Sequence, residues 1–391
     1  MAKRRKRARQ VIQLRVTLAG WLFLLMSLLV GLAAVRSTMP MMFIVFGVML
    51  GVVLISSVLS RGMIRAVAVH RELPPRAWQC ETLNVGYFIR NRRKRGSCLG
   101  LRLEEVKPQG IEDARGYCVH LPPQTVFRAG SRLAVYRRGR IRLSAIRVST
   151  QFPFGLLDVN QRIQQPTSLV VWPAKGRLQS DLLLHGASQS SNAPPSRTQG
   201  GQDEFFGLRE YRQGDNPRWI HWRRSAGRSV PVVREMAHPV PDAVFLVLET
   251  RMSGADELAA MHRETRLQFA ATLIEHALHR GYLVGLAMAG NDVPLVFTPA
   301  TGRGSRCDML DALADVNGST QVDLDTVIEA LPPRTLQNAQ TLVVAERPGD
   351  ISIRCMENLV RASRSLRVVG PNALDEIFEP NPLTSGEEGA A

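Results

Sequence analysis

The sequence predicts a membrane-anchored protein of several domains: a transmembrane hairpin of two helices, a small β-sandwich-like domain and a doubly wound α/β domain. Three observations predict this division. Two long uncharged segments lie near the N-terminus, alternating apolar and polar residues follow, and strand-like apolar runs then alternate with helical patterns. The chain has 391 residues, which suffices for two or three domains.

The first predicted domain, residues 1–71, consists of a basic N-terminus and two transmembrane helices at about 16–35 and 38–60. Each helix lacks charged residues and is long enough to cross a hydrocarbon core of about 30 Å. Basic residues precede the first helix and follow the second, whereas only Arg36 lies between them. The positive-inside rule therefore places both termini and the soluble domains in the cytoplasm.

The second predicted domain, residues 72–176, is rich in β-strands. Apolar residues alternate with polar ones, as in Leu83, Val85, Tyr87 and Ile89, and turn residues separate the runs. This texture is typical of a small β-sandwich or barrel with about six to eight short strands. The basic run at 91–96 is interpreted as a hairpin tip beside the membrane, with contact to phosphate, lipid headgroups or a protein as alternatives.

Residues 177–202 are rich in Ser, Gly, Gln and Pro and predict a flexible linker. The third domain, residues 203–379, follows it. An apolar strand at 244–248 precedes a helix over about 255–280, and shorter strands and helices alternate after it, which predicts a doubly wound α/β fold. The tail at 380–391 is predicted to be disordered.

The distribution of charge and the positions of the cysteines argue against several classes of function. The net charge is +16, but residues 1–71 contain eleven Lys or Arg and no acidic residue, and residues 72–175 contain eighteen basic and seven acidic residues. The C-terminal part is therefore negative overall, which argues against a nucleic-acid partner. The five cysteines form no C-x-x-C pair, so neither a disulfide scaffold nor a structural zinc site is predicted.

The most unusual segment, residues 203–228, places aromatic and Arg side chains around a Gly-Asp-Asn-Pro turn. We call residues 207–225 within it the Trp/Arg motif. Arginines beside aromatics can form a protein interface or stack on nucleobases. They can equally form a self-contained structural cluster, in which Asp215 and Glu210 hold the guanidinium groups. The pattern alone leaves these three interpretations open.

At this segment the chain also resembles a known family. The sequence FGLREYRQGDNPRWIHWRRSA is similar to the hallmark of the bacterial family called domain of unknown function number 58. Further similarities lie in Arg-Gly at 138–139, Pro-Phe-Gly-Leu at 153–156 and Val-Val-Trp-Pro at 170–173. The resemblance implies two membrane helices, a β-rich region and a von Willebrand factor A-like domain in the bacterial inner membrane. Members of that family are often encoded beside ATPases of the MoxR type and transglutaminase-like membrane proteins, so the resemblance makes such an ATPase the favoured partner.

An A-like domain invites a metal-site hypothesis, because such domains bind Mg²⁺ through an Asp-x-Ser-x-Ser loop after the first strand. The corresponding residues here run from Glu249 to Ser253, and only Ser253 keeps the expected type. Arg251 brings a permanent positive charge that repels a divalent cation. We therefore interpret Glu249 and Ser253 as degenerate positions and predict no bound metal.

The sequence contains no HExxH, GxSxG or P-loop signature, so we predict a protein without enzymatic activity or cofactor. The favoured function is a cytosolic adaptor or scaffold, anchored in the inner membrane, with a MoxR-type ATPase as its partner. The alternative is a cell-envelope hydrolase or transferase with an unrecognised site. The predicted partner-binding residues are Arg209, Tyr211, Gly214, Asp215, Arg218, Trp219, His221, Trp222 and Arg223.

Overall fold

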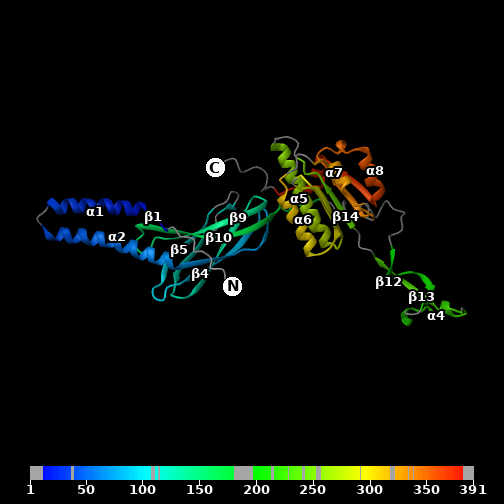
Figure 1. Cartoon of the computed structure of the whole chain (residues 1–391), viewed down its shortest axis with the longest axis horizontal. Helices are drawn as coiled ribbons and strands as arrows, with labels where there is room; N and C mark the ends of the chain where they lie inside the picture. The colour runs from blue at the N-terminus through cyan, green and yellow to red at the C-terminus, as the bar shows by residue number, and fades with distance from the viewer. Residues whose placement is uncertain are drawn as a thin grey trace, which may run out of the picture. The chain divides into compact units, whose positions relative to one another are not determined.

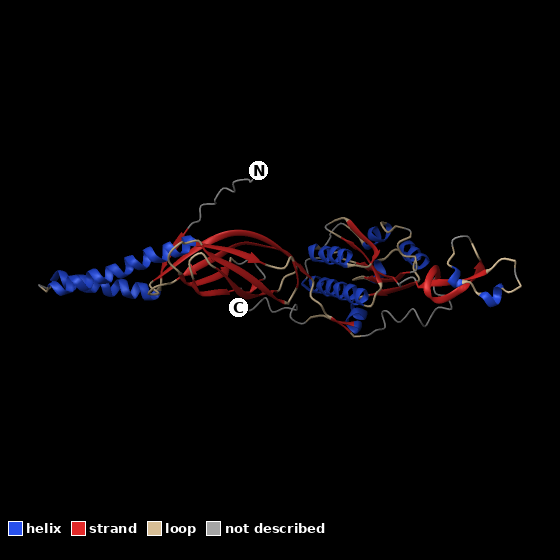
Figure 2. Ribbon diagram, turned by 90° about the horizontal axis from the view of Figure 1, so that it is seen from below, coloured by secondary structure: helices blue, strands red, loops and turns tan. Residues whose placement is uncertain are grey.

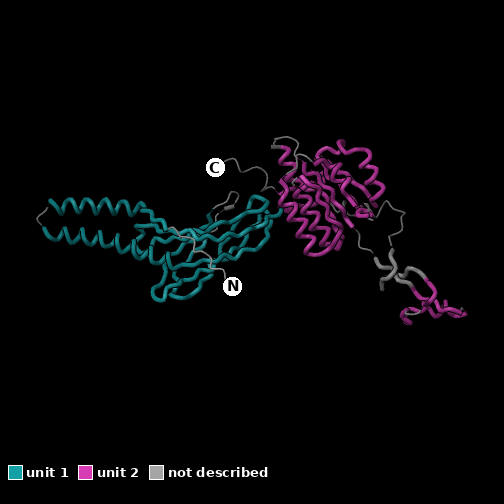
Figure 3. Tube along the Cα trace, in the orientation of Figure 1, with its two compact units in different colours: residues 1–172 teal, residues 173–391 magenta. Residues whose placement is uncertain are grey.

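The computed structural model describes residues 12–36, 39–106, 111–112, 115–179, 197–212, 215–227, 229–239, 243–251, 257–290, 292–317, 322–332, 334–337 and 339–381. It divides into two compact units, Met1–Trp172 and Pro173–Ala391 (Figure 3). Residues 180–196 of the predicted linker and 382–391 of the predicted tail lie outside the described ranges.

The first unit begins with two long apolar helices, α1 (Leu18–Arg36) and α2 (Pro40–Ala66), which pack against each other as a hairpin (Figure 1). Both are long and apolar enough to cross a membrane, and most of their large apolar side chains are exposed. Helix α2 extends past the predicted end at residue 60. Its last turns carry Met63 and Ile64 into the core of the adjoining β domain, which explains why the helix outlasts its uncharged segment.

Two sheets, antiparallel except for one short strand, form the body of this unit (Figure 2). Strand β1 (Ile12–Val16) ends just before α1, and β2 (Val67–Glu72) begins directly after α2. The larger sheet has the order β1-β10-β9-β5-β7, with β3 pairing parallel to β10, and the smaller has the order β2-β4-β8-β6. The strands of the larger sheet are β1 (Ile12–Val16), β3 (Arg76–Trp78), β5 (Cys98–Glu105), β7 (Arg115–Leu121), β9 (Gly139–Thr150) and β10 (Leu157–Trp172). Those of the smaller sheet are β2 (Val67–Glu72), β4 (Thr82–Asn91), β6 (Ile111–Glu112) and β8 (Val126–Val135).

One hydrophobic core joins the two sheets. Tyr87 and Ile89 from the smaller sheet and Leu101 and Leu103 from the larger sheet are fully buried in it. These residues occupy alternate positions of their strands, because successive side chains of a strand point to opposite faces. The alternation in the sequence thus corresponds to two facing layers.

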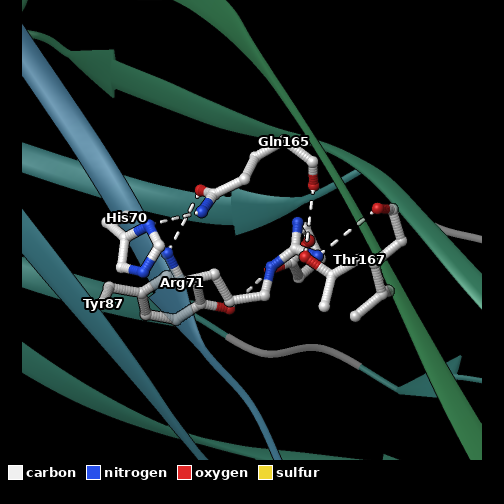
Figure 4. Close-up of polar contacts among 7 residues, drawn as sticks. His70, Arg71, Tyr87, Gln165 and Thr167 are labelled. Carbon is white, nitrogen blue, oxygen red and sulfur yellow. Dashed lines mark hydrogen bonds and ion pairs between the residues drawn. The ribbon is translucent and has the colours of Figure 1, made fainter. Parts of the chain in front are cut away.

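A buried ion pair also crosses between the sheets. Arg71 of β2 lies with its Nε 2.8 Å from Glu105 Oε1, and its Nη2 donates to Glu105 Oε2 at 2.9 Å. The Tyr87 hydroxyl donates to the same carboxylate at 2.9 Å. Figure 4 shows Arg71 and Tyr87 beside Gln165, whose Oε1 accepts a hydrogen bond from the Arg71 backbone N–H at 3.1 Å. Burial raises the pKa of the Glu105 carboxyl, and the charge of Arg71 opposes that shift.

Two strands of this domain were not anticipated. The sequence pattern predicts only the basic N-terminus and the two helices within residues 1–71. In the structure, β1 pairs with β10 and β2 pairs with β4, so the β domain includes residues from both sides of the helical hairpin. In β1 the apolar residues Ile12, Leu14 and Val16 alternate with polar ones and pack on the core. The short length of these strands and the charged residues Arg15 and Arg71 made this alternation hard to recognise in the sequence.

The second unit contains a five-stranded sheet of order β16-β15-β14-β17-β18, in which β16 alone runs antiparallel to its neighbour. Helices α5 and α6 pack together on one face, and α7 and α8 on the other (Figure 1). All six residues of β14 are buried, as expected for a strand covered on both faces. The elements are β14 (Ala243–Leu248), α5 (Glu257–His279), β15 (Leu283–Ala289), β16 (Pro294–Ala300), α6 (Arg303–Asp315), α7 (Leu324–Glu329), β17 (Ala339–Val344), η2 (Pro348–Asp350), α8 (Ile353–Ala362), β18 (Ser365–Val369) and α9 (Pro371–Ile377).

Both ends of the predicted linker take part in strands. β11 (Arg177–Leu178) pairs with β19 (Phe378–Glu379), and β12 (Arg197–Glu210) pairs with β13 (Val232–Pro239). These pairings join residues far apart in the sequence, so the local richness in Ser and Gly gave no sign of them.

Candidate partner-binding segment

The Trp/Arg motif spans the end of one strand of a β-hairpin and most of the connection that follows it. Strands β12 and β13 are antiparallel, with Arg209 opposite Val233 and Glu210 opposite Val232. The connection from 211 to 231 contains the short helices η1 (Pro217–Trp219) and α4 (Trp222–Ser225). The segment is therefore a folded loop with ordered ends.

A bidentate ion pair closes the first half of this connection. Arg209 Nη1 and Nη2 donate to the two carboxylate oxygens of Asp215, each at 2.6 Å. The backbone N–H of Arg212 donates to Asp215 Oδ2 at 2.8 Å. These hydrogen bonds, led by those from Arg209, lower the pKa of the Asp215 carboxyl to about 2. Asp215 is consequently ionised at neutral pH and fixes the turn that follows β12.

Backbone bonds and small polar side chains hold the second half. His221 N–H donates to the Val232 carbonyl at 2.7 Å, and Ile220 bridges to Val233. Ser225 Oγ accepts from the Val232 N–H at 2.9 Å. Asn216 accepts from the Arg218 N–H at 3.1 Å and so caps η1. The connection is thereby attached along β13 at several points.

The two Trp side chains are exposed, although the backbone that carries them is held in place. Trp222 is 69% exposed and Trp219 is 37% exposed. Arg218 and Arg223 are exposed as well, whereas Arg209, Tyr211, Asp215 and His221 are half-buried. Large indole surfaces beside exposed guanidinium groups, on an ordered backbone, are the features of a recognition surface.

The structure thus separates the predicted partner-binding residues into two groups. The first group holds the loop in shape: Arg209 and Asp215 come together, and Tyr211 and His221 form backbone hydrogen bonds to Pro231 and Val232. The second group faces solvent and consists of Trp219, Trp222, Arg218 and Arg223. Gly214 lies outside the described residues.

Sequence reasoning overlooked Ser225, Val232 and Val233, which complete the loop. Val232 and Val233 are 4% and 2% exposed. The apolar run from Val230 to Val233 directly after the motif was the available signal, because such a run typically forms the returning strand of a hairpin.

The degenerate metal position lies at the carboxyl end of the parallel strands. The Glu249 carboxylate accepts a hydrogen bond from the Glu346 N–H at 2.7 Å. Arg251 forms an ion pair with Asp323 at 2.6 Å, and Thr250 Oγ1 donates to the Ala289 carbonyl at 2.7 Å. Ser253 lies outside the described residues. Among the described residues, no group of three or more His, Cys, Asp or Glu is arranged to hold a metal ion.

The fold and this segment define a class of protein: two long apolar N-terminal helices joined to a mixed α/β body with several sheets, one of them carrying the Trp/Arg motif. Residues 207–371 match the family model described as "Protein of unknown function DUF58". The match begins in β12, includes the motif and the parallel sheet, and supports the DUF58 family. No curated protein matches the chain.

Proposed function

We propose that the protein is a non-enzymatic adaptor, anchored in the bacterial inner membrane, that binds a protein partner through the Trp/Arg motif and its α/β domain. The favoured partner is a MoxR-type ATPase, which the resemblance to the family implies. The soluble domains and both termini are cytoplasmic in this proposal.

The exposed Trp222 is the observation that carries the proposal. Trp, Tyr and Arg are enriched among the interface residues whose truncation weakens a protein–protein complex most. Here they stand on a loop that the Arg209–Asp215 pair and the bonds to β13 already hold in place. A preorganised loop loses little conformational freedom on binding, which favours affinity.

The charge of the loop indicates the kind of surface it meets. Arg218, Arg223 and Arg224 are all exposed. Of the two acidic residues of the motif, Glu210 is exposed and Asp215 is already paired with Arg209. A partner with an acidic patch around an apolar pocket would complement this surface and accelerate association.

The fold of the α/β domain supports the comparison with von Willebrand factor A-like domains. Its first strand, β14, lies in the middle of the sheet, and β15 and β17 flank it in parallel. We assign the A-like fold on this strand order, and we assign no metal to it because Glu249 and Arg251 are engaged with protein groups.

The helical hairpin supports membrane anchoring. The apolar side chains of α1 and α2 are exposed along most of both helices, an arrangement that water disfavours and lipid accommodates. Arg61 and Arg65 lie at the end of α2 that enters the β domain, and Arg36 lies at the opposite end of the hairpin. The excess of positive charge at the domain end supports a cytoplasmic β domain.

Affinity purification of the full-length protein from its native membrane tests the proposal. Wild type, Trp222→Ala and a control, Tyr117→Ala, are solubilised in detergent, and co-purifying proteins are identified by mass spectrometry. Tyr117 is an aromatic residue of β7 that is 54% exposed, so its removal is a comparable surface change outside the motif. An ATPase that accompanies wild type and the control but not Trp222→Ala supports the adaptor. Equal recovery with all three proteins removes the motif from the interface.

A further inference from the structure

The exposed apolar surface of the helical hairpin ends abruptly at the β domain. Leu59, which is 39% exposed, is the last exposed large apolar residue of α2, and the next residue, Ser60, is fully buried. Met63 and Ile64 of the helix are buried in the core of the β domain, and Val52 and Val53 already pack against that core on one side of the helix. Helix α1 begins at Leu18, which is 80% exposed. Leu18 and Leu59 therefore mark the boundary between the lipid-compatible surface and the folded domain.

One loop of the β domain packs against both helices at this boundary. It connects β9 to β10 and contains Phe152, Phe154 and Gly155. Ser60 Oγ of α2 donates to the Phe152 carbonyl at 2.6 Å, and Thr17 Oγ1, directly before α1, donates to the Gly155 carbonyl at 2.7 Å. The loop is thus hydrogen-bonded to both helices at the boundary marked by Leu18 and Leu59.

Two aromatic residues are exposed at that level. Phe154 is 56% exposed in the loop, and Trp21 is 63% exposed in the first turn of α1. A Cβ atom at Gly20 would overlap the Leu156 carbonyl, so α1 lies directly on the loop. Aromatic side chains favour the region between hydrocarbon and water, where an apolar ring meets polar headgroups.

A second loop, Arg92–Arg95, brings positive charge to the same region. The Arg92 N–H donates to the Ala66 carbonyl at the end of α2, at 2.9 Å. The guanidinium group of Arg93 lies over Gly62, where a Cβ atom would overlap it. The basic loop is therefore fixed against the last turns of α2, just beyond the boundary at Leu59.

Buried polar groups give this basic loop its shape. Asn91 is fully buried, and its Nδ2 donates to the carbonyls of Gly96 and Leu121 at 3.1 and 3.2 Å. Gln124 Nε2 donates to the carbonyls of Arg92 and Arg93 at 2.8 and 3.0 Å. The side chains of Arg92, Lys94 and Arg95 remain exposed, and no ion pair joins them to a carboxylate within the described residues.

We propose that this end of the β domain is a binding surface for anionic phospholipid headgroups. It consists of the basic loop Arg92–Arg95, Arg61 and Arg65 of α2, and the aromatic residues Trp21 and Phe154. The proposal rests on the membrane anchoring proposed above and extends it. In this proposal the β domain contacts the bilayer surface directly, and its attachment does not depend on the two helices alone.

Position and charge together favour lipid as the occupant. The cations follow immediately after the last exposed apolar turn of α2, which is where phosphate groups lie when the helix spans a bilayer. Each Lys or Arg near an anionic leaflet contributes attraction, and several on one rigid surface add their effects. A soluble protein partner would have to share this space with the headgroups.

The test uses the full-length protein reconstituted in vesicles of equal phosphatidylglycerol and phosphatidylcholine. The relative association of the two lipids with the protein is measured with spin-labelled analogues of each. The test variant is Arg92→Gln/Lys94→Gln/Arg95→Gln, which leaves Arg93 on Gly62. The matched control is Arg132→Gln/Arg137→Gln/Arg142→Gln. These three exposed cations lie near the end of β8, in the turn after it and near the start of β9, at the end of these strands that is away from the basic loop.

We expect wild type and control to prefer phosphatidylglycerol and the test variant to lose at least about threefold of that preference. Equal lipid preference in all three proteins would overturn the proposal while leaving membrane anchoring intact. Failure of wild type to remain in the vesicles after alkaline carbonate extraction would instead contradict the anchoring itself. Circular dichroism of the reconstituted proteins shows whether the test variant keeps its fold.

Discussion

Arg209 and Asp215 form a bidentate ion pair across a turn, with each Nη atom 2.6 Å from a different carboxylate oxygen. The pair connects the end of β12 to the start of the loop that presents Trp219 and Trp222. Of the two acidic residues of the motif, Asp215 thus shapes the loop, and the indoles remain available for contact. This division of roles leads to separate predictions for the two groups of residues.

The order of the loop should depend on pH only under acidic conditions. Because the pKa of Asp215 falls to about 2 in the folded state, ionised Asp215 stabilises the loop at every pH above the ordinary value for Asp. That contribution is lost as pH falls from about 4 to about 2. Hydrogen exchange of residues 211–225, corrected for intrinsic rates, should show constant protection from pH 7 to 5 and a decline below 4. The same decline in Asp215→Asn would show that another group is responsible.

The buried ion pair between Arg71 and Glu105 should contribute far more to the stability of the protein than the Arg209–Asp215 pair does. Arg71 and Glu105 are 3% and 8% exposed, so Glu105→Gln leaves a buried cation without its counter-charge. We expect a loss of about 3–5 kcal/mol in the free energy of unfolding of the β domain. Tyr87→Phe removes one hydrogen bond to the same carboxylate and should cost about 1–2 kcal/mol. Urea titrations of the full-length proteins in detergent provide both values, and a smaller effect for Glu105→Gln than for Tyr87→Phe would contradict this account.

Magnesium should have no effect on the α/β domain. Glu249 already accepts a backbone hydrogen bond, and Arg251 places a cation beside the loop that follows β14. We expect the melting temperature in millimolar Mg²⁺ to equal that in the presence of a chelator. A rise in the melting temperature that Glu249→Ala abolishes would establish a site that includes Glu249.

Membrane topology can be examined with single cysteines. Arg95 lies in the exposed basic loop, and Met41, in the first turn of α2, is also exposed. In intact cells a membrane-impermeant maleimide should label Met41→Cys and should reach Arg95→Cys only after lysis, because the proposal places the β domain in the cytoplasm. Wild type, whose five cysteines are free thiols, measures the background. Labelling of Arg95→Cys in intact cells would reverse the topology and favour the alternative of an envelope enzyme.

Local sequence patterns predicted most of the α/β domain. The helix expected over 255–280 is α5 (Glu257–His279), and the strand expected at 244–248 is β14 (Ala243–Leu248). Both have a continuous apolar stripe or run, which the core requires and which a sequence window can detect. The pattern did not predict helix α9 (Pro371–Ile377).

Long-range pairing accounts for the other differences. The strand β1 has only five residues, and its partner β10 lies more than a hundred residues later, so its own pattern could not reveal the pairing. The same limit applies to the candidate site. One of the interpretations left open by the composition of the motif had Asp215 and Glu210 hold guanidinium groups, and Asp215 does hold Arg209. The attachment to Val232 depends on a hairpin register that only the structure reveals.

The most direct test of the central claim is photo-crosslinking in living cells with benzoylphenylalanine placed at position 222 or, as the control, at position 117. Both side chains are exposed, and only the first belongs to the motif. We expect one discrete crosslinked product at position 222, which mass spectrometry identifies as an AAA ATPase and which is lacking at position 117. If position 222 crosslinks to no protein, or to the same proteins as position 117, the Trp/Arg motif is not a partner-binding surface and the adaptor proposal fails.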